Sequence, residues 1–356
     1  MGDGPGGGVR ESWTGRSVTH LVVGPPDHGV TIFARRLARH TDGRLVEVPD
    51  PGTAGVAADR RGDAGVHLHY TEALFGPTTG EAAEAFVRLR SGLGGRVTVT
   101  LHDLPDPADE PGRYRRRALG YGRVALAADA VCVSSEHERA LLETLLDRFA
   151  DAARPAGLRV IPLPVRAPVR PDRWPPVAPQ VGVFGFVYPG KGHDDVLEAM
   201  AGLPESVGLI AIGRVADGHE ELARRLTARA AALGRRLEIT GFVPDDQVDE
   251  RLARVAVPIV PARTISASGS LNTWLSAGRR PLVADGPYAR ELDRACPGAV
   301  TLYRPDGLAG MIRAVLADPR LGRLLQPLPG ERLESGVAAA YGAFFREAAE
   351  PSAAVA

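Results

Sequence analysis

The chain has 356 residues, 44% of them hydrophobic, and its 43 basic and 43 acidic residues give a formal net charge of zero. This length exceeds that of one ordinary domain and predicts two, each with its own core. Because basic and acidic residues balance, the composition argues against the electropositive surface with which proteins bind nucleic acid. We therefore expect no nucleic-acid partner.

The sequence has two cysteines, Cys132 and Cys296, which lie far apart without a further Cys or His at metal-ligand spacing. This argues against a disulfide framework and a structural zinc site, and it predicts two reduced, buried thiols. The Gly-rich start lacks an apolar segment, and no apolar run approaches the roughly 18 residues of a membrane span. We expect a disordered N-terminus at 1–16, no transmembrane segment and a cytoplasmic protein.

Between residues 17 and 165, short apolar runs alternate with amphipathic stretches. Such alternation predicts βαβ units and a parallel sheet with helices on both faces. A helix expected at 136–149 begins with a capping box, because Ser135 is followed by Glu138 three residues later. The expected strands lie in the runs VTHLVV, GVHLHY, VTVTLHD, AVCVSS and RVIPLPV.

The stretch 166–180 contains five prolines and no hydrophobic periodicity. Since proline restrains φ and removes a backbone donor, we expect an extended linker between a first domain at 17–165 and a second at 181–334. The second domain repeats the alternation and opens with a strand expected at 181–187. A last helix, at 335–350, follows a Pro-rich turn.

One loop of the second domain carries a distinctive lysine. In open parallel sheets, ligands bind beyond the carboxyl ends of the strands. In the segment GFVYPGKGHDD, Gly190 and Gly192 flank Lys191 just before a helix, whose N-terminal amides carry partial positive charge. Lys191 is the only lysine in the chain. Its retention favours a phosphate site too tight for a guanidinium over an ordinary turn with a solvated lysine.

A second loop collects small polar residues. Ser266, Ser268, Gly269 and Ser270 precede an apolar helix expected from about Leu271. Hydroxyls and free amides at a helix N-terminus predict a second anion site, although simple N-capping would explain a single serine. The loops of the first domain lack the glycine patterns of dinucleotide-binding and P-loop enzymes, which argues against both classes.

The first domain offers polar residues at a strand end. His67 and His69 alternate along an expected strand, and Glu72 follows at its end. Without a third ligand nearby we expect no metal site. The place of Glu72 at the strand end favours a position that lines a cleft over one in the core. Five arginines between Arg113 and Arg123 would suit a peripheral contact with anionic lipid, although such a cluster is more often a solvated helix face.

In order and spacing, these segments resemble the retaining nucleotide-sugar glycosyltransferases of the GT-B fold, glycosyltransferase family 4 in particular. The resemblance implies an α/β fold of two Rossmann-like, doubly wound domains facing a cleft. The first domain would bind the acceptor and the second the nucleotide-diphosphate sugar, and the last helix would cross back onto the first domain. The segments that carry the likeness are GPPDHGV, HLHYTEALFG, TLHDLP, VCVSSEHE, GFVYPGKGHDDVLEAM, ITGFVPDDQVDERL and SASGSLNTWLSAGRRPLVAD.

The resemblance also implies roles for single residues. Lys191 matches the lysine that binds the donor diphosphate, and His102 matches the active-site histidine beside the donor sugar. Gly29 matches a glycine whose backbone faces the diphosphate. His69 and Glu72 end a strand of the first domain that would face the cleft, so we expect them on the acceptor side. Arg214, Arg263 and the amides of Ser268, Gly269, Ser270 and Leu271 are further candidates for donor contacts.

The chain departs from the family at three positions. The family's arginine five residues before the lysine is Phe186 here, and its two glutamates spaced by seven residues correspond to Ile265 and Thr273. These differences mark a divergent member and leave the identity of the donor open.

The implied reaction is metal-independent and needs no cofactor, because the nucleotide-sugar is itself a substrate and no Asp-x-Asp motif occurs. A small-molecule or glycan acceptor would receive the sugar on a hydroxyl with retention of configuration. Two alternatives remain: a non-catalytic nucleotide-sugar-binding partner or sensor, which the missing glutamates favour, and a sugar-nucleotide epimerase of the same fold.

Overall fold

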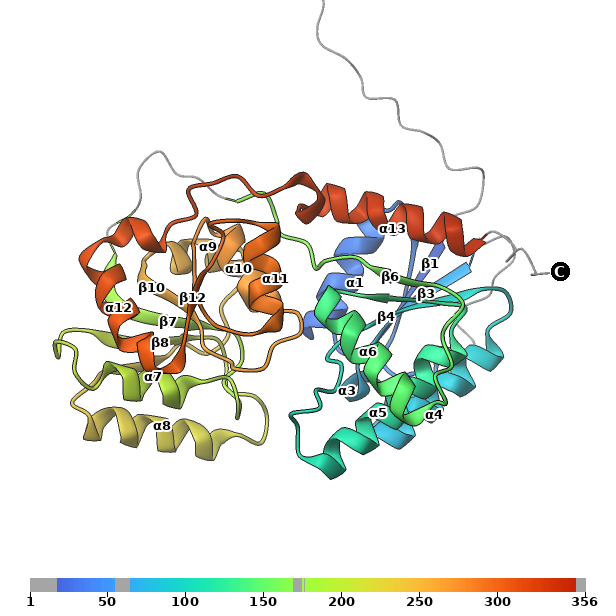
Figure 1. The fold of residues 1–356 in the computed structure, drawn as a ribbon, viewed down its shortest axis with the longest axis horizontal. Helices are drawn as coiled ribbons and strands as arrows, with labels where there is room; N and C mark the ends of the chain where they lie inside the picture. Colours follow the sequence, from blue (N-terminus) through green and yellow to red (C-terminus); the bar gives the residue numbers. More distant parts are fainter. Residues whose placement is uncertain (1–17, 55–64, 169–174, 176, 350–356) are drawn as a thin grey trace, which may run out of the picture.

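Two parallel β-sheets of six strands each organise the described residues, as the computed structural model shows (Figure 1). The structure describes residues 18–54, 65–168, 175 and 177–349. The predicted disordered segment 1–16 and most of the stretch 169–176 within the predicted linker lie outside the described residues.

The first sheet has the strand order β2-β1-β3-β4-β5-β6, and all of its pairings are parallel. The order changes direction between β1 and β3, which makes this pair the switch point of the sheet. The strands are β1 (Val18–Val23), β2 (Arg44–Val48), β3 (Gly65–Tyr70), β4 (Val97–Leu101), β5 (Ala130–Val133) and β6 (Leu158–Val160). The helices are α1 (Gly29–His40), α3 (Glu72–Phe75), α4 (Thr79–Gly92), α5 (Pro111–Ala127) and α6 (Glu136–Phe149).

The second sheet has the order β12-β11-β10-β7-β8-β9, again parallel throughout, with its switch point between β7 and β10. Its strands are β7 (Ala178–Phe184), β8 (Gly208–Ile212), β9 (Leu237–Ile239), β10 (Val255–Val260), β11 (Leu282–Ala284) and β12 (Thr301–Tyr303). Its helices are α7 (His193–Met200), α8 (Glu220–Ala232), α9 (Asp245–Ala253), α10 (Gly269–Ser276), α11 (Pro287–Ala295) and α12 (Leu308–Ala317). Both sheets confirm the predicted doubly wound α/β class.

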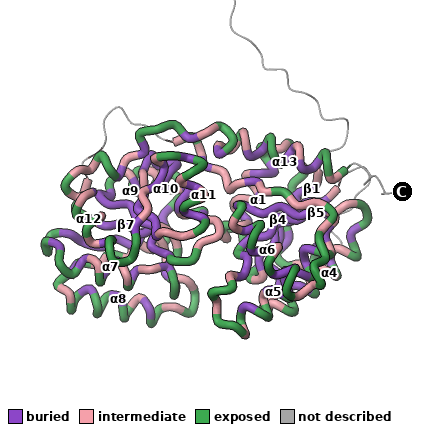
Figure 2. The backbone as a smooth tube through the Cα atoms, in the orientation of Figure 1, coloured by how far each residue is buried: buried purple, intermediate pink, exposed green. Residues whose placement is uncertain are grey.

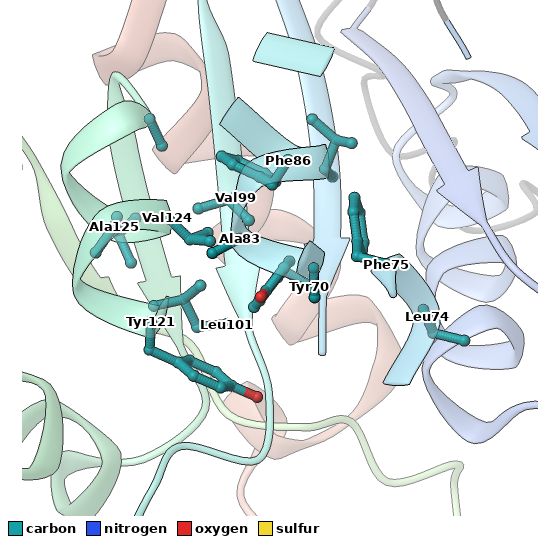
Figure 3. Packing of buried hydrophobic residues seen from close by; sticks show 14 of the residues in the cluster. Tyr70, Leu74, Phe75, Ala83, Phe86, Val99, Leu101, Tyr121, Val124 and Ala125 are labelled. Atoms are coloured by element: carbon teal, nitrogen blue, oxygen red, sulfur yellow. The ribbon is translucent and has the colours of Figure 1, made fainter. Parts of the chain in front are cut away.

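The inner strands of each sheet, such as β4, β8 and β10, are buried because helices cover both sheet faces, which explains their nearly continuous apolar runs (Figure 2). The edge strand β2 is largely exposed. On one face of the first sheet, Tyr70, Phe75 and Phe86 form an aromatic cluster, with the Tyr70 and Phe75 ring centres 4.9 Å apart (Figure 3). Outer helices bury only one stripe: α8 turns Leu222 and Leu226 inward. The amphipathic stretches predicted from the sequence thus form the helices that cover the sheets.

The last helix, α13 (Glu334–Ala349), packs on the first domain beside α1 (Figure 1). Its Tyr341 is fully buried, and the tyrosine hydroxyl lies 2.9 Å from Thr100 Oγ1. Cys132 belongs to the same apolar cluster, and both it and Cys296 are free and buried, as predicted. The expected crossing helix is therefore present.

The first strand of the second domain lies three residues earlier than expected, at Ala178–Phe184 instead of 181–187. It ends because Gly185 has a φ of +107°, which breaks the ladder. Beyond it, Val187 keeps one isolated bridge to Val215. The last residues of the predicted linker thus form part of β7, while the predicted domain boundaries stay predictions.

Candidate functional site

Loops at the carboxyl ends of the two sheets contact one another. An Arg214 guanidinium nitrogen, after β8, lies 3.5 Å from an Asp27 carboxylate oxygen, after β1. The Ser135 hydroxyl, after β5, donates to the Ser266 carbonyl, after β10, at 2.7 Å. The two switch points therefore lie in one region of the molecule, where open α/β sheets bind ligands. We call the loops that meet here the facing edges: residues 24–28, 71–72, 102–104, 134–138, 185–192, 213–217 and 261–270.

Lys191 lies on the facing edges and is 7% exposed. Its Nζ donates to Ser270 Oγ at 3.1 Å and lies 5.9 Å from the ring centre of Tyr188. Burial lowers the pKa of Lys191 to about 8, and in the described part of the chain no carboxylate pairs with its Nζ. A buried cation without a counter-ion is unfavourable, and a bound anion would offset that cost.

Glycines allow the Lys191 loop to approach the loop after β10. Gly192 has a φ of +92°, and a Cβ there would lie 2.8 Å from the carbonyl carbon of Pro261. A Cβ at Gly185 would lie 3.3 Å from Lys191 Nζ. Both positions favour glycine because their φ is positive, and Gly192 requires it also for space, since the Pro261 backbone cannot move aside as a side chain can. The two predicted anion loops are thus packed together at the β7/β10 switch point.

The serine-rich loop leads into α10, which begins at Gly269 and not near Leu271 as expected. Ser268 is the N-cap and accepts from Leu271 N at 3.2 Å, so capping accounts for Ser268 and already engages the Leu271 amide. The Ser270 hydroxyl lies 3.2 Å from Ser268 Oγ and also accepts from Lys191. The amides of Gly269 and Ser270 belong to the first turn, where N–H groups have no intrahelical acceptor.

His102 follows β4 and pairs with His69 at the end of β3. His102 Nε2 lies 3.1 Å from His69 Nδ1, and the stacked rings have centres 5.4 Å apart. Burial lowers the pKa of His102 to about 4, while Asp103 acts in the opposite direction. Burial also lowers the pKa of His69 well below its usual range. Both imidazoles are therefore neutral near pH 7 and suited to hydrogen bonding.

Behind this pair lies His67, which has a structural role. Its Nδ1 and Nε2 lie 2.9 Å and 3.1 Å from the hydroxyls of Thr98 and Thr100. Its ring centre lies 4.8 Å from that of His69 and 5.8 Å from that of His20, so buried histidines form a row along two neighbouring strands. Among the described residues, no group of three His, Cys, Asp or Glu side chains could hold a metal ion.

Gly29 is the first residue of α1, at the β1 side of the facing edges. A Cβ at this position would meet no atom within 4 Å, so the start of the helix faces open space. His28 caps the helix, with Nδ1 accepting from Val30 N at 3.2 Å. This geometry is compatible with the predicted approach of a ligand to the Gly29 backbone.

Arg214 and Arg263, which were predicted to contact the nucleotide-sugar donor, differ in their surroundings. The Arg214 guanidinium carbon lies 4.8 Å from the ring centre of Phe186, at the position where the family that the sequence resembles has an arginine. A guanidinium from the β8 loop therefore stands beside the position where that arginine is missing. Arg263 is exposed, and its Nε and Nη2 donate to the Asp195 carboxylate at 3.0 Å and 2.8 Å. Its role as a donor contact stays a prediction.

Glu72 and His69 have different partners, although both were expected on the acceptor side. The Glu72 carboxylate accepts from Arg117 Nε at 2.8 Å and from Thr79 Oγ1 at 2.5 Å. Arg117, one of the clustered arginines, also donates to the Asp103 carbonyl at 2.6 Å. Glu72 thus orders the start of α3 against α5, next to the loop that carries His102.

Asp103 and Tyr188 belong to the facing edges but were not predicted. Asp103 has a φ of +55°, and its carboxylate accepts from Thr71 Oγ1 at 3.0 Å. Burial raises the pKa of Tyr188, and the negative charge of Asp103 adds to this effect. The sequence did contain a signal for Asp103, because an aspartate directly after His102 can adopt the left-handed conformation of a tight turn.

Ile265 and Thr273, at the positions where the resembled family has glutamates, make apolar and intrahelical contacts instead of contributing a carboxylate. Ile265 packs against an apolar cluster of the second domain. Thr273 Oγ1 donates to the Gly269 carbonyl within α10, at 2.9 Å. Positive charge on Lys191 is therefore not balanced by a carboxylate from either position.

Comparison with solved structures of other proteins identifies the fold of the chain. No family model matches the chain, and no curated protein matches it significantly. A sucrose-phosphate synthase from Thermosynechococcus elongatus superposes with a TM-score of 0.67 at 17% identity, covering 93% of this chain and 99% of that one. HepE from Anabaena, in complex with UDP and glucose, gives 0.62 at 16%, covering 93% and 95%. The chain has the GT-B fold.

A third GT-B neighbour is longer than this chain. The pneumococcal O-GlcNAc transferase GtfA, in complex with UDP and GlcNAc, has a TM-score of 0.57 at 12% identity and covers 81% of this chain and 57% of that one. At such identities the similarity supports only the fold. The chemistry of this GT-B protein therefore has to be inferred from the residues of its own facing edges. Within the described ranges, no helix has the length and apolar composition of a membrane span.

Proposed function

We propose that this GT-B protein is a retaining glycosyltransferase that moves a sugar from a nucleotide-diphosphate sugar to an acceptor hydroxyl. The observation that carries the proposal is the Lys191 ammonium, buried beside the start of α10 with a serine hydroxyl as its hydrogen-bond partner. A diphosphate would supply the missing negative charge, and free helix amides would bind its oxygens. HepE and GtfA, which share the fold, were each solved with UDP.

The same groups would stabilise the leaving group. As the bond between the anomeric carbon and the phosphate oxygen breaks, negative charge builds on the diphosphate. Lys191, the amides of Gly269 and Ser270 and the α10 dipole are already oriented to receive it. The acceptor hydroxyl would attack from the face that the diphosphate leaves and pass its proton to the departing phosphate oxygen. Configuration is then retained, and the step uses no protein nucleophile.

The first domain would hold the acceptor and the sugar. His102, neutral near pH 7, would hydrogen-bond the donor sugar at the end of β4, with His69 behind it fixing the ring. Glu72, anchored by Arg117, would lie on the acceptor side. Because a side chain and helix amides balance the diphosphate charge, the proposed reaction is metal-independent.

One observation favours a second candidate function. Ile265 and Thr273 give no carboxylate where the family has its glutamates, which would suit a protein that binds a nucleotide-sugar as a partner or sensor without turning it over. The buried Lys191 serves binding in both cases, so it does not separate the two.

The experiment that separates them is incubation of the purified chain with UDP-, GDP- and dTDP-sugars, with nucleotide release and the sugar product both measured. Slow release of nucleoside diphosphate that requires Lys191 supports the transferase. Binding by calorimetry without release supports the sensor, and an altered sugar on the same nucleotide would indicate an epimerase. A chain that neither binds nor turns over any of the three overturns the proposal.

A further inference from the structure

A buried carboxylate of the first domain reaches the serine-rich loop of the second. Glu138, in the first turn of α6, is 0% exposed. It accepts from Ser134 N at 2.7 Å through one oxygen and from the Ser266 hydroxyl at 2.8 Å through the other. The predicted capping box is half formed: Ser135 Oγ accepts from Glu138 N at 2.9 Å, but the carboxylate binds the Ser134 amide instead of that of Ser135.

Ser266 is held through two of its polar groups. Its hydroxyl donates to Glu138, and its carbonyl accepts from the Ser135 hydroxyl at 2.7 Å. Nearby, Glu291 of α11 accepts from the amides of Glu136 and His137 at 2.9 Å and 3.0 Å, so a carboxylate of the second domain binds the N-terminus of α6. The start of α6 is thus a specific contact between the domains.

This contact is more than a helix cap. Burial raises the pKa of Glu138 to about 7, which shows how unfavourable its environment is for a charge. At the start of α5, by contrast, Glu110 accepts from the amides of Gly112 and Arg113 at 2.8 Å and 2.7 Å while it stays exposed. A cap therefore does not need a buried carboxylate, and the additional interaction of Glu138 is the one with Ser266.

Ser266 lies at the start of the segment that meets Lys191. Two residues later Ser268 caps α10, and two residues after that Ser270 accepts from Lys191 Nζ. We propose that Glu138 is a positioning residue for nucleotide binding, which holds Ser266 from the first domain and thereby sets segment 266–270 against Lys191. The proposal rests on the proposed function, because it names what orders the same diphosphate site. Donor binding then depends on contact between the two domains.

The test compares three variants, Glu138→Ala, Ser266→Ala and the double variant that combines them, with a control, Asp147→Asn. Asp147 lies on the same helix but outside the facing edges, and its half-exposed side chain pairs with Arg154. Two quantities are measured on the full chain: calorimetric affinity for UDP, GDP and dTDP, and hydrogen exchange of the amides in 262–272. We expect each single variant to weaken binding about tenfold or more and to speed exchange in this segment. The double variant should lose no more affinity than the more strongly affected single variant, because both substitutions remove one shared contact.

A conservative replacement gives a further readout. Glu138→Gln can still accept from Ser134 N and can donate to the Ser266 hydroxyl, so it should restore most of the affinity that Glu138→Ala loses. If Glu138→Ala does not fold, Ser266→Ala tests the same contact with the α6 cap intact. Unchanged affinity and exchange in Ser266→Ala, or additive losses in the double variant, would overturn the positioning role. A parent that binds no nucleoside diphosphate instead refutes the proposed function, while exchange still reports whether Glu138 holds the loop.

Discussion

Lys191 Nζ lies 3.1 Å from the hydroxyl of Ser270, although the two residues are 79 positions apart in sequence. They meet because β7 and β10 are neighbours at the switch point of the second sheet, so the loops that follow both strands leave the same edge. A hydroxyl orients the ammonium but does not neutralise it. The pair therefore forms a preorganised positive site to which an anion can bind.

The first prediction concerns Lys191 itself. Lys191→Ala should lower the transfer rate roughly a hundredfold or more, as expected for the loss of one preorganised donor to a leaving group. Lys191→Arg should also lose activity, though less severely, because the planar guanidinium needs more room than the loop between Gly185 and Gly192 provides. Nucleotide release and nucleoside-diphosphate affinity would be measured for both variants.

The control for this pair is Arg254→Ala, which removes an exposed positive charge that pairs with Glu250 one helical turn away. It should behave like the parent in both assays. If Lys191→Ala also transferred sugar and bound diphosphate like the parent, Lys191 would be a structural residue of the turn and the proposed site would be wrong.

A second prediction follows from the pKa of Lys191, about 8 in the free protein. A bound diphosphate favours the charged ammonium, so the pKa of Lys191 should rise in the complex. Below pH 8 the lysine is already charged and binding takes up little proton. Above pH 8 binding should take up as much as one proton, and affinity should fall up to about tenfold per pH unit until the pKa of the complex is reached.

Calorimetry in buffers of different ionisation enthalpy measures this proton uptake directly. The phosphate, with a second pKa of about 6, does not titrate in the same window. Lys191→Ala should abolish the uptake near pH 9. An uptake of the same size in that variant would assign the proton to another group.

The third prediction concerns Glu72, whose carboxylate pairs with Arg117 at 2.8 Å. Glu72→Gln keeps the shape but removes the charge, so it should weaken use of the acceptor and leave nucleotide affinity nearly unchanged. Because the Arg117 side chain is only 11% exposed, the free energy of unfolding should also fall, by about 1–3 kcal/mol. Acceptor kinetics, calorimetry and denaturant unfolding measure the three effects. An equal loss of nucleotide binding would count against an acceptor-side position.

The fold could be predicted because its strongest signals are local. Apolar runs alternate with amphipathic stretches along the chain, and each helix buries a stripe such as Leu222 and Leu226 of α8. Lys191 could also be singled out, since it is the only lysine and stands between two glycines at a strand end. The end of the strand β7 was predicted three residues too late, because Gly185 ends it through a positive φ that hydrophobic periodicity does not show.

The partners of the site residues could not be predicted in the same way. Ser270 meets Lys191 only through the order of the strands, and Glu138 meets Ser266 only through the contact between the domains. Likewise, the ion pair of Glu72 with Arg117 joins two helices 45 residues apart in sequence, where the local pattern suggested a solvated arginine cluster. Each of these contacts is set by tertiary structure.

The last prediction concerns His102 at the end of β4. Burial lowers its pKa to about 4, so the imidazole is neutral near pH 7 and meets the donor sugar as a hydrogen-bonding group. Its contact should matter most when the anomeric carbon gains positive character, so His102→Ala should lower turnover more than it lowers nucleotide affinity. Between about pH 5.5 and 7.5 this residue should add no pH dependence to turnover, because it would be charged only below its low pKa. His67→Ala is the matched control: it removes a buried histidine of the same row that bonds only threonine hydroxyls among the described residues, so it should lower stability without a specific loss of turnover. Steady-state kinetics at saturating donor, with thermal unfolding of each variant, measure both effects. Full transfer activity in His102→Ala, or an equal loss in both variants, would remove His102 from the site.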